Sequence, residues 1–415
     1  MKLAIFDIEN WREIGATLAR NKTRTFLTAF GIFWGTAMLA MLLGGASGME
    51  GIMRRQFAGF ATNMGATFSG TRSLSYKGFN KGSYWQLTEQ DIALVRSKAP
   101  YIEKSSEING KSVTATYGDK TKSCQVIGVE AEYSEIVSPI LTEGRLLNET
   151  DVLHNRKVAV IGKNMATELF GSGSPLGKYV GLDGVYFLVV GVAAQRGDMS
   201  IAGRIDDSFL LPSTTMRRAY NFGNKVGFFV YTAPSGHGPS ENEAAIRRAI
   251  SHNHPIHPND ERAIQFMDIS QNFAMVDGLF LGLSILALFV GAGSLMAGVI
   301  GVGNIMWIIV KERTHEFGIR RALGAKPLDI TVQVLSESVV LTLISGVAGV
   351  CFATIVLGVV DMVSADPIHG TAGFQISFGL AMGIVFAFIV LGTAAGTLPA
   401  VKAMKIKPIE ALRDK

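Results

Sequence analysis

The ionisable side chains with the most regular spacing lie between residues 312 and 326. If this segment is helical, Glu312 and Glu316 fall on consecutive turns, and Arg320 follows near the C-terminal end, where a cation complements the helix dipole. Such residues can form ion pairs, and the two glycines of the segment would let it pack closely on another backbone. The alternative is a solvated loop whose charges only orient the chain in a membrane. The residues assigned to this element are Glu312, Arg313, Thr314, Glu316, Gly318, Arg320, Arg321 and Gly324.

Glu337 stands at the entrance to a long apolar run that begins soon after this segment. A carboxylate in hydrocarbon is costly, so it must reach the interface or pair with a cation. Lys311 and Arg321 are the expected partners. A proton-relay role would require a second acid within the apolar runs, so we expect structural pairing.

Three imidazoles, those of His252, His254 and His257, have a spacing that could bind zinc or copper. The stretch is broken by prolines and offers no cysteine ligand, so we expect a solvated loop and assign no metal site. The sequence contains no G-x-S-x-G elbow, no H-E-x-x-H pair and no phosphate-binding G-x-x-x-x-G-K-[ST] loop. We assign no catalytic residue and no cofactor-binding residue.

The composition indicates a membrane protein that carries a polar domain. Hydrophobic residues make up 48% of the 415 positions and charged residues only 18%, and the mean hydropathy is +0.29. The net charge of +5 does not form a nucleic-acid-binding patch, because the cations lie mostly at the edges of apolar runs. The two cysteines, Cys124 and Cys351, make a disulfide framework implausible.

Four uncharged runs are long enough to span a bilayer, which requires about 20 residues. Nearly all Lys and Arg clusters close to these runs lie on one side, the exception being Arg54-Arg55 at the start of the long external segment, and this pattern predicts that both chain ends are cytoplasmic. The predicted order is a surface helix at 1–24, spans at 25–47, 278–310, 331–360 and 376–398, an extracytoplasmic domain at 48–277, a cytoplasmic segment at 311–330, a short external loop at 361–375 and a cytoplasmic tail at 399–415.

The polar domain is predicted to be mixed α/β and to comprise two small subdomains. Residues 88–91 resemble a capping box that opens a helix, and Gly118-Asp119 predicts a hairpin turn. The runs at 158–161, 187–190, 209–211 and 228–231 predict strands.

The second span is rich in small residues, which allow membrane helices to approach closely. Packing within one chain and a seam with a second copy are both compatible with this pattern. The residues assigned to this face are Gly291, Gly298, Gly301 and Asn304.

Four separate motifs resemble the MacB/FtsX-type permeases of ABC systems. The first is residues 21–32 (NKTRTFLTAFGI), and the most specific is residues 304–306 (NIM) with 312–325 (ERTHEFGIRRALGA). The other two comprise Gly144, Arg145, Asp151, 158–162 (VAVIG), 169–171 (LFG), 175–177 (PLG) and 189–192 (VVGV) in the polar domain, and 398–400 (LPA), Ala403 and 408–413 (PIEALR) near the end.

The resemblance implies four transmembrane helices and a MacB-like periplasmic core domain, with residues 312–325 docking as a coupling helix on an ATPase. It implies a permease without its own ATPase, so that ATP and magnesium bind to a separate ATPase subunit. The expected partners are that ATPase, a second permease copy or a paralogue, and a periplasmic adaptor with an outer-membrane duct. The expected function is efflux of a small molecule or peptide by mechanotransmission. Lipoprotein extraction and control of a cell-wall hydrolase are alternatives, as is an ATP-independent receptor.

Overall fold

The computed structural model describes residues 22–365, 371 and 373–404. The chain forms two compact units, Met1–Ile52 with Asp277–Lys415, and Met53–Val276. We call the first the helical unit and the second the α/β unit. Most of the predicted surface helix at 1–24 and of the tail at 399–415 lies outside the described residues.

Four helices in the described part of the chain are long and apolar enough to cross a membrane. α9 has 44 residues, about 66 Å at 1.5 Å per residue, whereas a hydrocarbon core measures about 30 Å. The helices are α2 (Lys22–Gln56), α9 (Ile269–Glu312), α11 (Pro327–Val363) and α12 (Phe378–Met404), with the short α10 (Thr314–Ala322) between α9 and α11.

The first three predicted spans lie within longer helices, because the apolar run measures the hydrocarbon thickness and not the length of the helix, whereas the fourth, 376–398, begins two residues before α12. The first run ends near residue 46, but α2 continues for almost three further turns, with Glu50, Arg54 and Arg55, to Gln56. α11 likewise begins before its predicted span, at Pro327, whose ring is well placed in the first turn of a helix. The Lys326 N–H donates to Asp329 Oδ2 at 3.0 Å and caps this turn.

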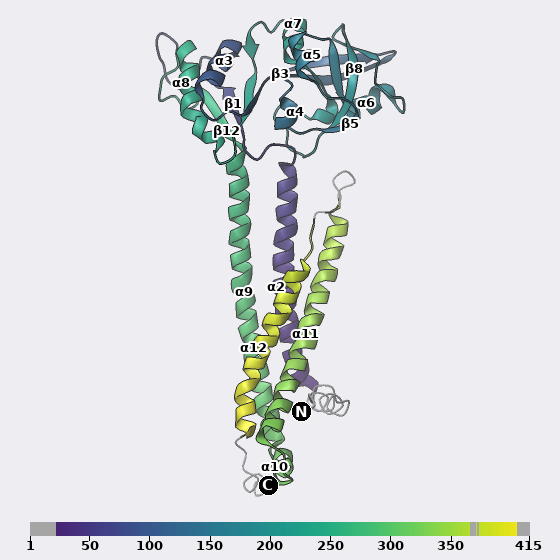
Figure 1. The fold of residues 1–415 in the computed structure, drawn as a ribbon, viewed down its shortest axis with the longest axis vertical. Helices are drawn as coiled ribbons and strands as arrows, with labels where there is room; N and C mark the ends of the chain where they lie inside the picture. Colours follow the sequence, from purple (N-terminus) through teal and green to yellow (C-terminus); the bar gives the residue numbers. More distant parts are fainter. Residues whose placement is uncertain (1–21, 366–370, 372, 405–415) are drawn as a thin grey trace. The chain divides into compact units, whose positions relative to one another are not determined.

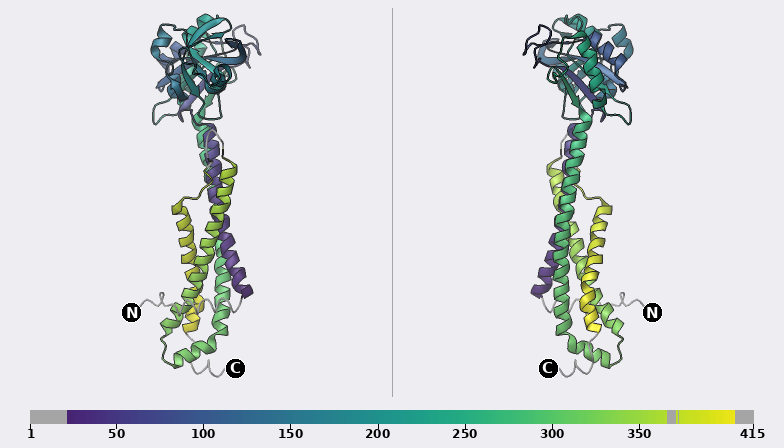
Figure 2. Two further views of the ribbon diagram at one scale, coloured as in Figure 1. Left: turned by 90° about the vertical axis from the view of Figure 1, so that its right-hand side faces the viewer. Right: turned by 90° about the vertical axis from the view of Figure 1, so that its left-hand side faces the viewer.

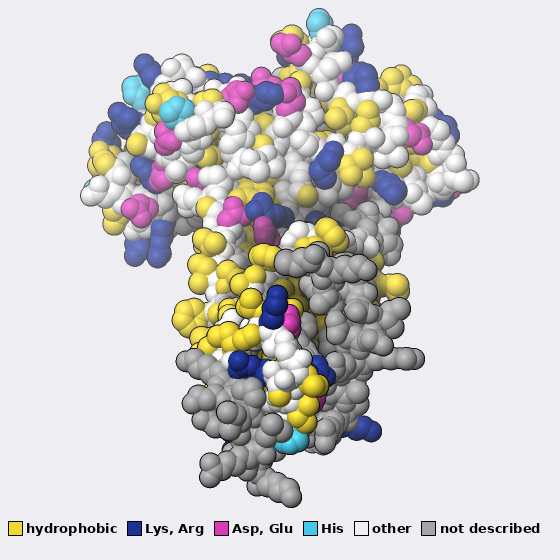
Figure 3. Space-filling view, turned by 60° about the horizontal axis from the view of Figure 1, so that its bottom comes forward, with side chains coloured by type: hydrophobic (Ala, Val, Ile, Leu, Met, Phe, Trp, Pro, Cys, Tyr) yellow, Lys and Arg dark blue, Asp and Glu magenta, His cyan; other side chains and the backbone are white. Residues whose placement is uncertain are grey.

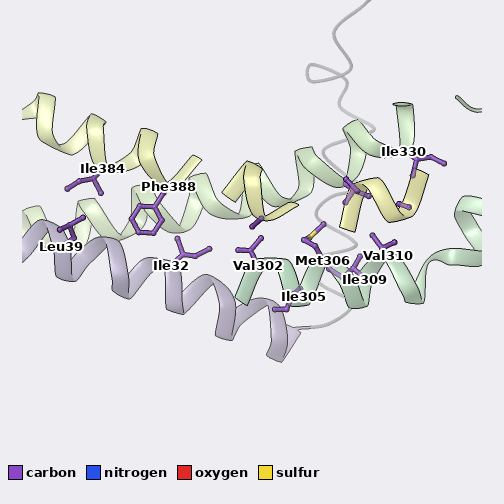
Figure 4. Packing of buried hydrophobic residues seen from close by; sticks show 14 of the residues in the cluster. Ile32, Leu39, Val302, Ile305, Met306, Ile309, Val310, Ile330, Ile384 and Phe388 are labelled. Carbon is purple, nitrogen blue, oxygen red and sulfur yellow. The ribbon is translucent and has the colours of Figure 1, made fainter. Parts of the chain in front are cut away.

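The four long helices run alongside one another (Figures 1 and 2), and all of them contribute to one apolar core (Figure 4). Ile32 and Leu39 of α2 face Ile384 and Phe388 of α12 in this core, and α9 supplies a row of residues at helical spacing. That row is Val302, Ile305, Met306, Ile309 and Val310. The start of α2, the α10 turn and the end of α12 lie at one end of the bundle.

The α/β unit is organised around a sheet with the strand order β12-β1-β11-β3-β4-β9-β6-β8-β5, while β7 pairs with β3 and β8. A separate pair joins β2 and β10. The strands are β1 (Met64–Ser69), β2 (Leu87–Thr88), β3 (Lys104–Tyr117), β4 (Lys120–Val129), β5 (Ile140–Gly144), β6 (Val158–Gly162), β7 (Tyr179–Leu182), β8 (Val185–Ala194), β9 (Ser208–Pro212), β10 (Lys225–Val226), β11 (Phe228–Thr232) and β12 (Ile264–Asp268).

The two halves of this unit are joined by a shared strand, not by a linker. The first part of β3 pairs with β11, from Lys104 to Ile108, and the rest, from Asn109 to Tyr117, pairs with β4. The helices around the sheet are α3 (Glu89–Lys98), α4 (Tyr133–Ile136), α5 (Glu149–Leu153), α6 (Lys163–Phe170), α7 (Ser213–Ala219) and α8 (Glu243–Asn253), with short 3-10 turns at Ile205–Asp207 and Pro239–Asn242.

Local signals in this unit fold as predicted. Thr88 caps α3 in a reciprocal capping box with Asp91. Gly118 and Asp119 form the two-residue connection between β3 and β4, where Tyr117 pairs with Lys120. The predicted strands are β6, β8, β9 and β11.

Candidate functional site

The junction between α9 and α10 is a hydrogen-bonded bend at a single residue, Arg313. Its φ of −98° and ψ of 13° depart from helical values. The backbone hydrogen bonds nevertheless continue across it, from the Arg313 N–H to Ile309 and from the Phe317 N–H to Arg313, both at 3.0 Å. The Thr314 hydroxyl donates to the carbonyl of Val310 at 3.0 Å, so the last turn of α9 has satisfied acceptors. α10 therefore leaves α9 in a defined direction.

The guanidinium of Arg313 lies between two carboxylates. Its Nε and Nη2 donate to the two oxygens of Glu316 at 2.9 and 2.8 Å, and Nη1 donates to Glu337 Oε1 at 2.9 Å. The Arg313 side chain is 10% exposed and that of Glu337 only 2%. The guanidinium also lies 5.1 Å from the ring centre of the fully buried Phe317. Hydrogen bonds to Glu316 raise the pKa of Arg313 against the opposing effect of burial, so Arg313 stays charged.

A second arginine, about two helical turns after Arg313, makes a similar connection. Arg320 Nη2 donates to Glu316 Oε1 at 2.9 Å, and its Nη1 donates to Gln333 Oε1 on α11 at 3.2 Å. The neighbouring Arg321 donates to the carbonyl of Met404, the last residue of α12, at 3.0 Å. α10 is thereby bonded to both helices that follow it.

Beside these charges, α10 and the start of α11 expose large apolar side chains. Leu323 is 84% exposed, Leu328 66% and Ile319 40%. We call these three residues the α10 apolar surface. Figure 3 looks toward this end of the helical unit and shows exposed hydrophobic side chains close to Lys and Arg side chains.

The other predicted residues of this segment differ in their exposure and their backbone conformation. Glu312 is exposed, whereas Gly318 is buried beside Phe317. Gly324 has a φ of +101°, a value that favours glycine, and it follows the end of α10. The sequence interpretation did not identify Gln333 or the α10 apolar surface. Ile319 and Leu323 are four positions apart, on either side of Arg320 and Arg321, and that spacing could have revealed them.

Among the described residues, Arg313 is the cation that pairs with Glu337, whereas the sequence interpretation named Lys311 and Arg321. That expectation was wrong because the bend at Arg313 directs its side chain toward α11, while Lys311 is exposed and Arg321 reaches α12. The bend depends on tertiary packing and is invisible in the spacing of charges.

Three glycines of the second span pack against α2 of the same chain. A Cβ at Gly291 would meet the Leu39 side chain, one at Gly298 would lie 3.4 Å from Ile32, and one at Gly301 would lie 3.7 Å from Thr28. Asn304 is exposed. Gly293 has open space around its Cβ position.

The histidines at 252–257 also differ from expectation at one position. His254 is not a solvated loop residue, since its Nε2 lies 2.7 Å from Asp91 Oδ2 and only 18% of its side chain is exposed. Among the described residues, no group of three or more His, Cys, Asp or Glu side chains is placed to hold a metal ion.

Comparison with known proteins gives two family matches. Residues 25–249 match the MacB-like periplasmic core domain, and residues 288–408 match the FtsX-like permease C-terminal domain. The chain is 31% identical to the macrolide export ATP-binding/permease protein MacB of Chlorobaculum tepidum over 96% of its own length and 60% of the relative's. It is 29% identical to the pyoverdine export ATP-binding/permease protein PvdT of Pseudomonas aeruginosa over 94% of its length and 56% of the relative's.

The chain thus spans less than two thirds of the length of these relatives. Among solved structures, the periplasmic region of MacB from Actinobacillus actinomycetemcomitans matches 54% of the chain and 97% of its own length, with 18% identity and a TM-score of 0.42. The extracellular domain of the noncanonic ABC-type transporter YknZ from Gram-positive bacteria matches 49% of the chain and all of its own length, with 22% identity and a TM-score of 0.42.

Proposed function

Because the chain belongs to the MacB/FtsX-type family of ABC permeases, we propose that it couples ATP hydrolysis on a separate ATPase subunit to conformational work of its α/β unit. In this proposal the chain itself is not catalytic, and α10 is the element that docks on the ATPase. ATP and magnesium bind to that partner. The bilayer is a bacterial cytoplasmic membrane, and both chain ends are cytoplasmic.

The observation that carries the proposal is the α10 apolar surface. Residues 313–329 contain six charged side chains, which hydrocarbon would not accept, so the segment lies in water. Three large apolar side chains exposed to water within such a segment are typical of a site for another protein. Arg320 and Lys326 beside them add charge that can orient the partner.

The test is affinity purification of the tagged full chain from its native membrane in a mild detergent, with mass spectrometry of the proteins that co-purify. We expect a P-loop ATPase with the parent chain and with Leu153→Glu, a control at an exposed leucine of the α/β unit. We expect the Leu323→Glu chain to be purified without the ATPase. If no P-loop ATPase accompanies the parent chain, the coupling proposal fails and an ATP-independent receptor becomes the better reading.

The work done by the machine is proposed to be export of a small molecule or peptide by mechanotransmission. Two copies of the permease would approach each other when the ATPase binds ATP, and α2 and α9, which both continue into the α/β unit, would carry the motion. The names of the relatives, a macrolide exporter and a pyoverdine exporter, support export. A periplasmic adaptor and an outer-membrane duct would then complete the path, and the same purification would reveal the adaptor. A lipoprotein or a cell-wall hydrolase in its place would replace export by extraction or regulation.

A further inference from the structure

Five side chains bond α10 to α11 at two successive turns of α11. Arg313 reaches Glu337, and Arg320 reaches Gln333, which lies one turn earlier on the same face of α11. Glu316 connects the two arginines, since its Oε1 accepts from both of them. We call these five residues the Arg313 clamp.

Arg313 lies at the point where the backbone could bend between α9 and α10, so the clamp acts directly on that point. Arg313 is the residue at which α9 ends and α10 begins. A short helix joined to a long one by a single non-helical residue can rotate about that residue unless side chains prevent it. The clamp connects the pivot itself to α11, so it fixes α9, α10 and α11 in one arrangement.

Ion pairing is not the only interaction that holds α10 in the fold. Phe317 packs with Ile330 and Val334 of α11 in the apolar core of the helical unit. A buried ion pair contributes little net stability compared with apolar residues of the same size, because desolvation offsets the attraction. Its distinctive property is directional: the planar guanidinium of Arg313 binds two carboxylates in a fixed fork geometry. The cluster is therefore better suited to fixing an orientation than to stabilising the fold.

We propose that Arg313 is a positioning residue that makes the adjoining ends of α9, α10 and α11 move as one body. A displacement of α10 by a docked partner then moves α9 and α11 together, whereas without the clamp it would be lost as bending at Arg313. This inference rests on the coupling function proposed above and adds the residues that transmit the motion.

The first test measures the rigidity of α10 and needs no partner. Spin labels are attached to Ala322→Cys and Ile344→Cys, both exposed positions, in the full chain with Cys124→Ser and Cys351→Ser, reconstituted in lipid nanodiscs. We expect pulsed dipolar spectroscopy to give one narrow distance distribution for the parent, and a distribution at least twice as wide for Glu337→Ala and for Arg313→Ala. Glu337→Gln, which keeps an acceptor for Arg313, should recover most of the narrow distribution.

The matched control is Lys311→Ala, which removes an exposed cation two positions before Arg313 and should leave the distribution narrow. The double variant Arg313→Ala/Glu337→Ala should have a distance distribution no wider than that of either single variant, because each single substitution already breaks the same pair. A distribution for Glu337→Ala that matches the parent in position and width would overturn the proposal.

The second test separates the clamp from the docking surface. Labels at Leu283 of α9 and Ile355 of α11 report the two helices while the P-loop ATPase obtained by co-purification is bound and ATP with vanadate is added. We expect the parent to shift its distance distribution, and Glu337→Ala to bind the ATPase as the parent does but to lose the shift. If Glu337→Ala binds the ATPase and still shows the shift in distance distribution, the clamp proposal is contradicted but the proposed function is not. If the parent does not bind the ATPase, the proposed function itself is contradicted.

Discussion

The imidazole Nε2 of His254 lies 2.7 Å from Oδ2 of Asp91, although 163 positions separate the two residues in the chain. Asp91 also accepts hydrogen bonds from the backbone and hydroxyl of Thr88 and from Asn253 Nδ2. The Trp85 ring packs against the same imidazole with the ring centres 4.8 Å apart. One buried carboxylate therefore caps the start of α3 and holds the end of α8.

This arrangement predicts an acid-sensitive contribution to stability. Burial would raise the pKa of Asp91, but hydrogen bonds from His254, Thr88 and Asn253 outweigh it and hold the pKa below its ordinary value of 3.8. A carboxyl whose pKa is lower in the folded chain contributes stability above the unfolded value and loses it as pH falls through the folded value. Asp91→Asn should therefore lower the free energy of unfolding by about 3 kcal/mol at pH 7, and the difference should shrink below about pH 4.

The measurement is thermal unfolding of the full chain in nanodiscs between pH 7 and pH 3, followed by tryptophan fluorescence. Asp119→Asn, in the exposed β3–β4 turn, is the control and should follow the parent at every pH. Curves for Asp91→Asn that stay parallel to the parent down to pH 3 would show that the carboxylate is not the group responsible.

The sequence predicted those parts of the fold that depend on neighbouring residues. The capping box at Thr88 and Asp91 and the turn at Gly118 and Asp119 involve groups within four positions of each other, so their patterns are local. Strand order is not local. The division of β3 between β11 and β4, which joins the two halves of the sheet, depends on pairing partners far along the chain.

In the candidate site the sequence likewise located the segment but not its contacts. The charges of residues 312–326 are evident from composition and order, and the family resemblance suggested a coupling role. That Arg313 and not Lys311 faces Glu337 depends on a bend of the backbone at one residue. The pairing of His254 with Asp91 was hidden for a similar reason, because the acid comes from a distant helix.

A second buried acid explains the spacing of a sequence motif. Asp151 accepts from Nη1 and Nη2 of Arg145 at 2.6 and 3.1 Å and forms a capping box with Asn148 at the start of α5. Asp151→Ala removes the acceptor of the Asn148 N–H and of Arg145, whose side chain is 41% exposed and would be hydrated. The loss is therefore that of a helix cap and of charge-assisted hydrogen bonds, and it should lower the free energy of unfolding by about 1–2 kcal/mol. Glu149→Ala, an exposed acid on the same helix, should change it by less than about 0.5 kcal/mol.

Urea unfolding of the full chain, followed by circular dichroism, provides the comparison for Asp151. Arg145→Lys is the informative intermediate, because a lysine cannot make the paired hydrogen bonds of a guanidinium. We expect it to lose part of the stability lost by Asp151→Ala. Equal effects of Asp151→Ala and Glu149→Ala would contradict a specific role for the pair.

The thiol of Cys124 should be nearly unreactive in the folded chain. Cys124 is buried in the α/β unit, and burial raises the pKa of its thiol to about 11. Since the thiolate is the reactive form, alkylation at pH 8 should be about 100-fold slower than for an unperturbed cysteine. The measurement is maleimide labelling of Cys351→Ser, before and after denaturation, by mass spectrometry. Rapid labelling of the folded chain would mean that this part of the sheet opens.

Gly349 allows α2 to pack closely on α11. A Cβ at Gly349 would lie 2.5 Å from the Phe33 carbonyl oxygen and 3.0 Å from the Thr36 Cβ, so the backbones would have to separate. Gly349→Ala should lower the midpoint of thermal unfolding of the helical unit by several degrees, corresponding to about 1–3 kcal/mol. Gly358→Ala, on the same helix with open space at its Cβ position, should leave the midpoint unchanged or raise it slightly. Similar losses from both substitutions would point to a general effect of alanine in α11.

The proposed second permease copy should approach α9 at Gly293. Gly291, two positions earlier, is already occupied by Leu39 of α2, whereas the Cβ position of Gly293 is open. Small residues on an open helix face allow another membrane helix to come close. Gly293→Cys, in the full chain with Cys124→Ser and Cys351→Ser, should form a disulfide-linked dimer when native membranes are oxidised with copper phenanthroline. Ile355→Cys, exposed on α11, should remain monomeric. A dimer linked at residue 355 but not at 293 would move the seam from α9 to α11, because disulfide formation requires the two Cα atoms to approach within about 7 Å.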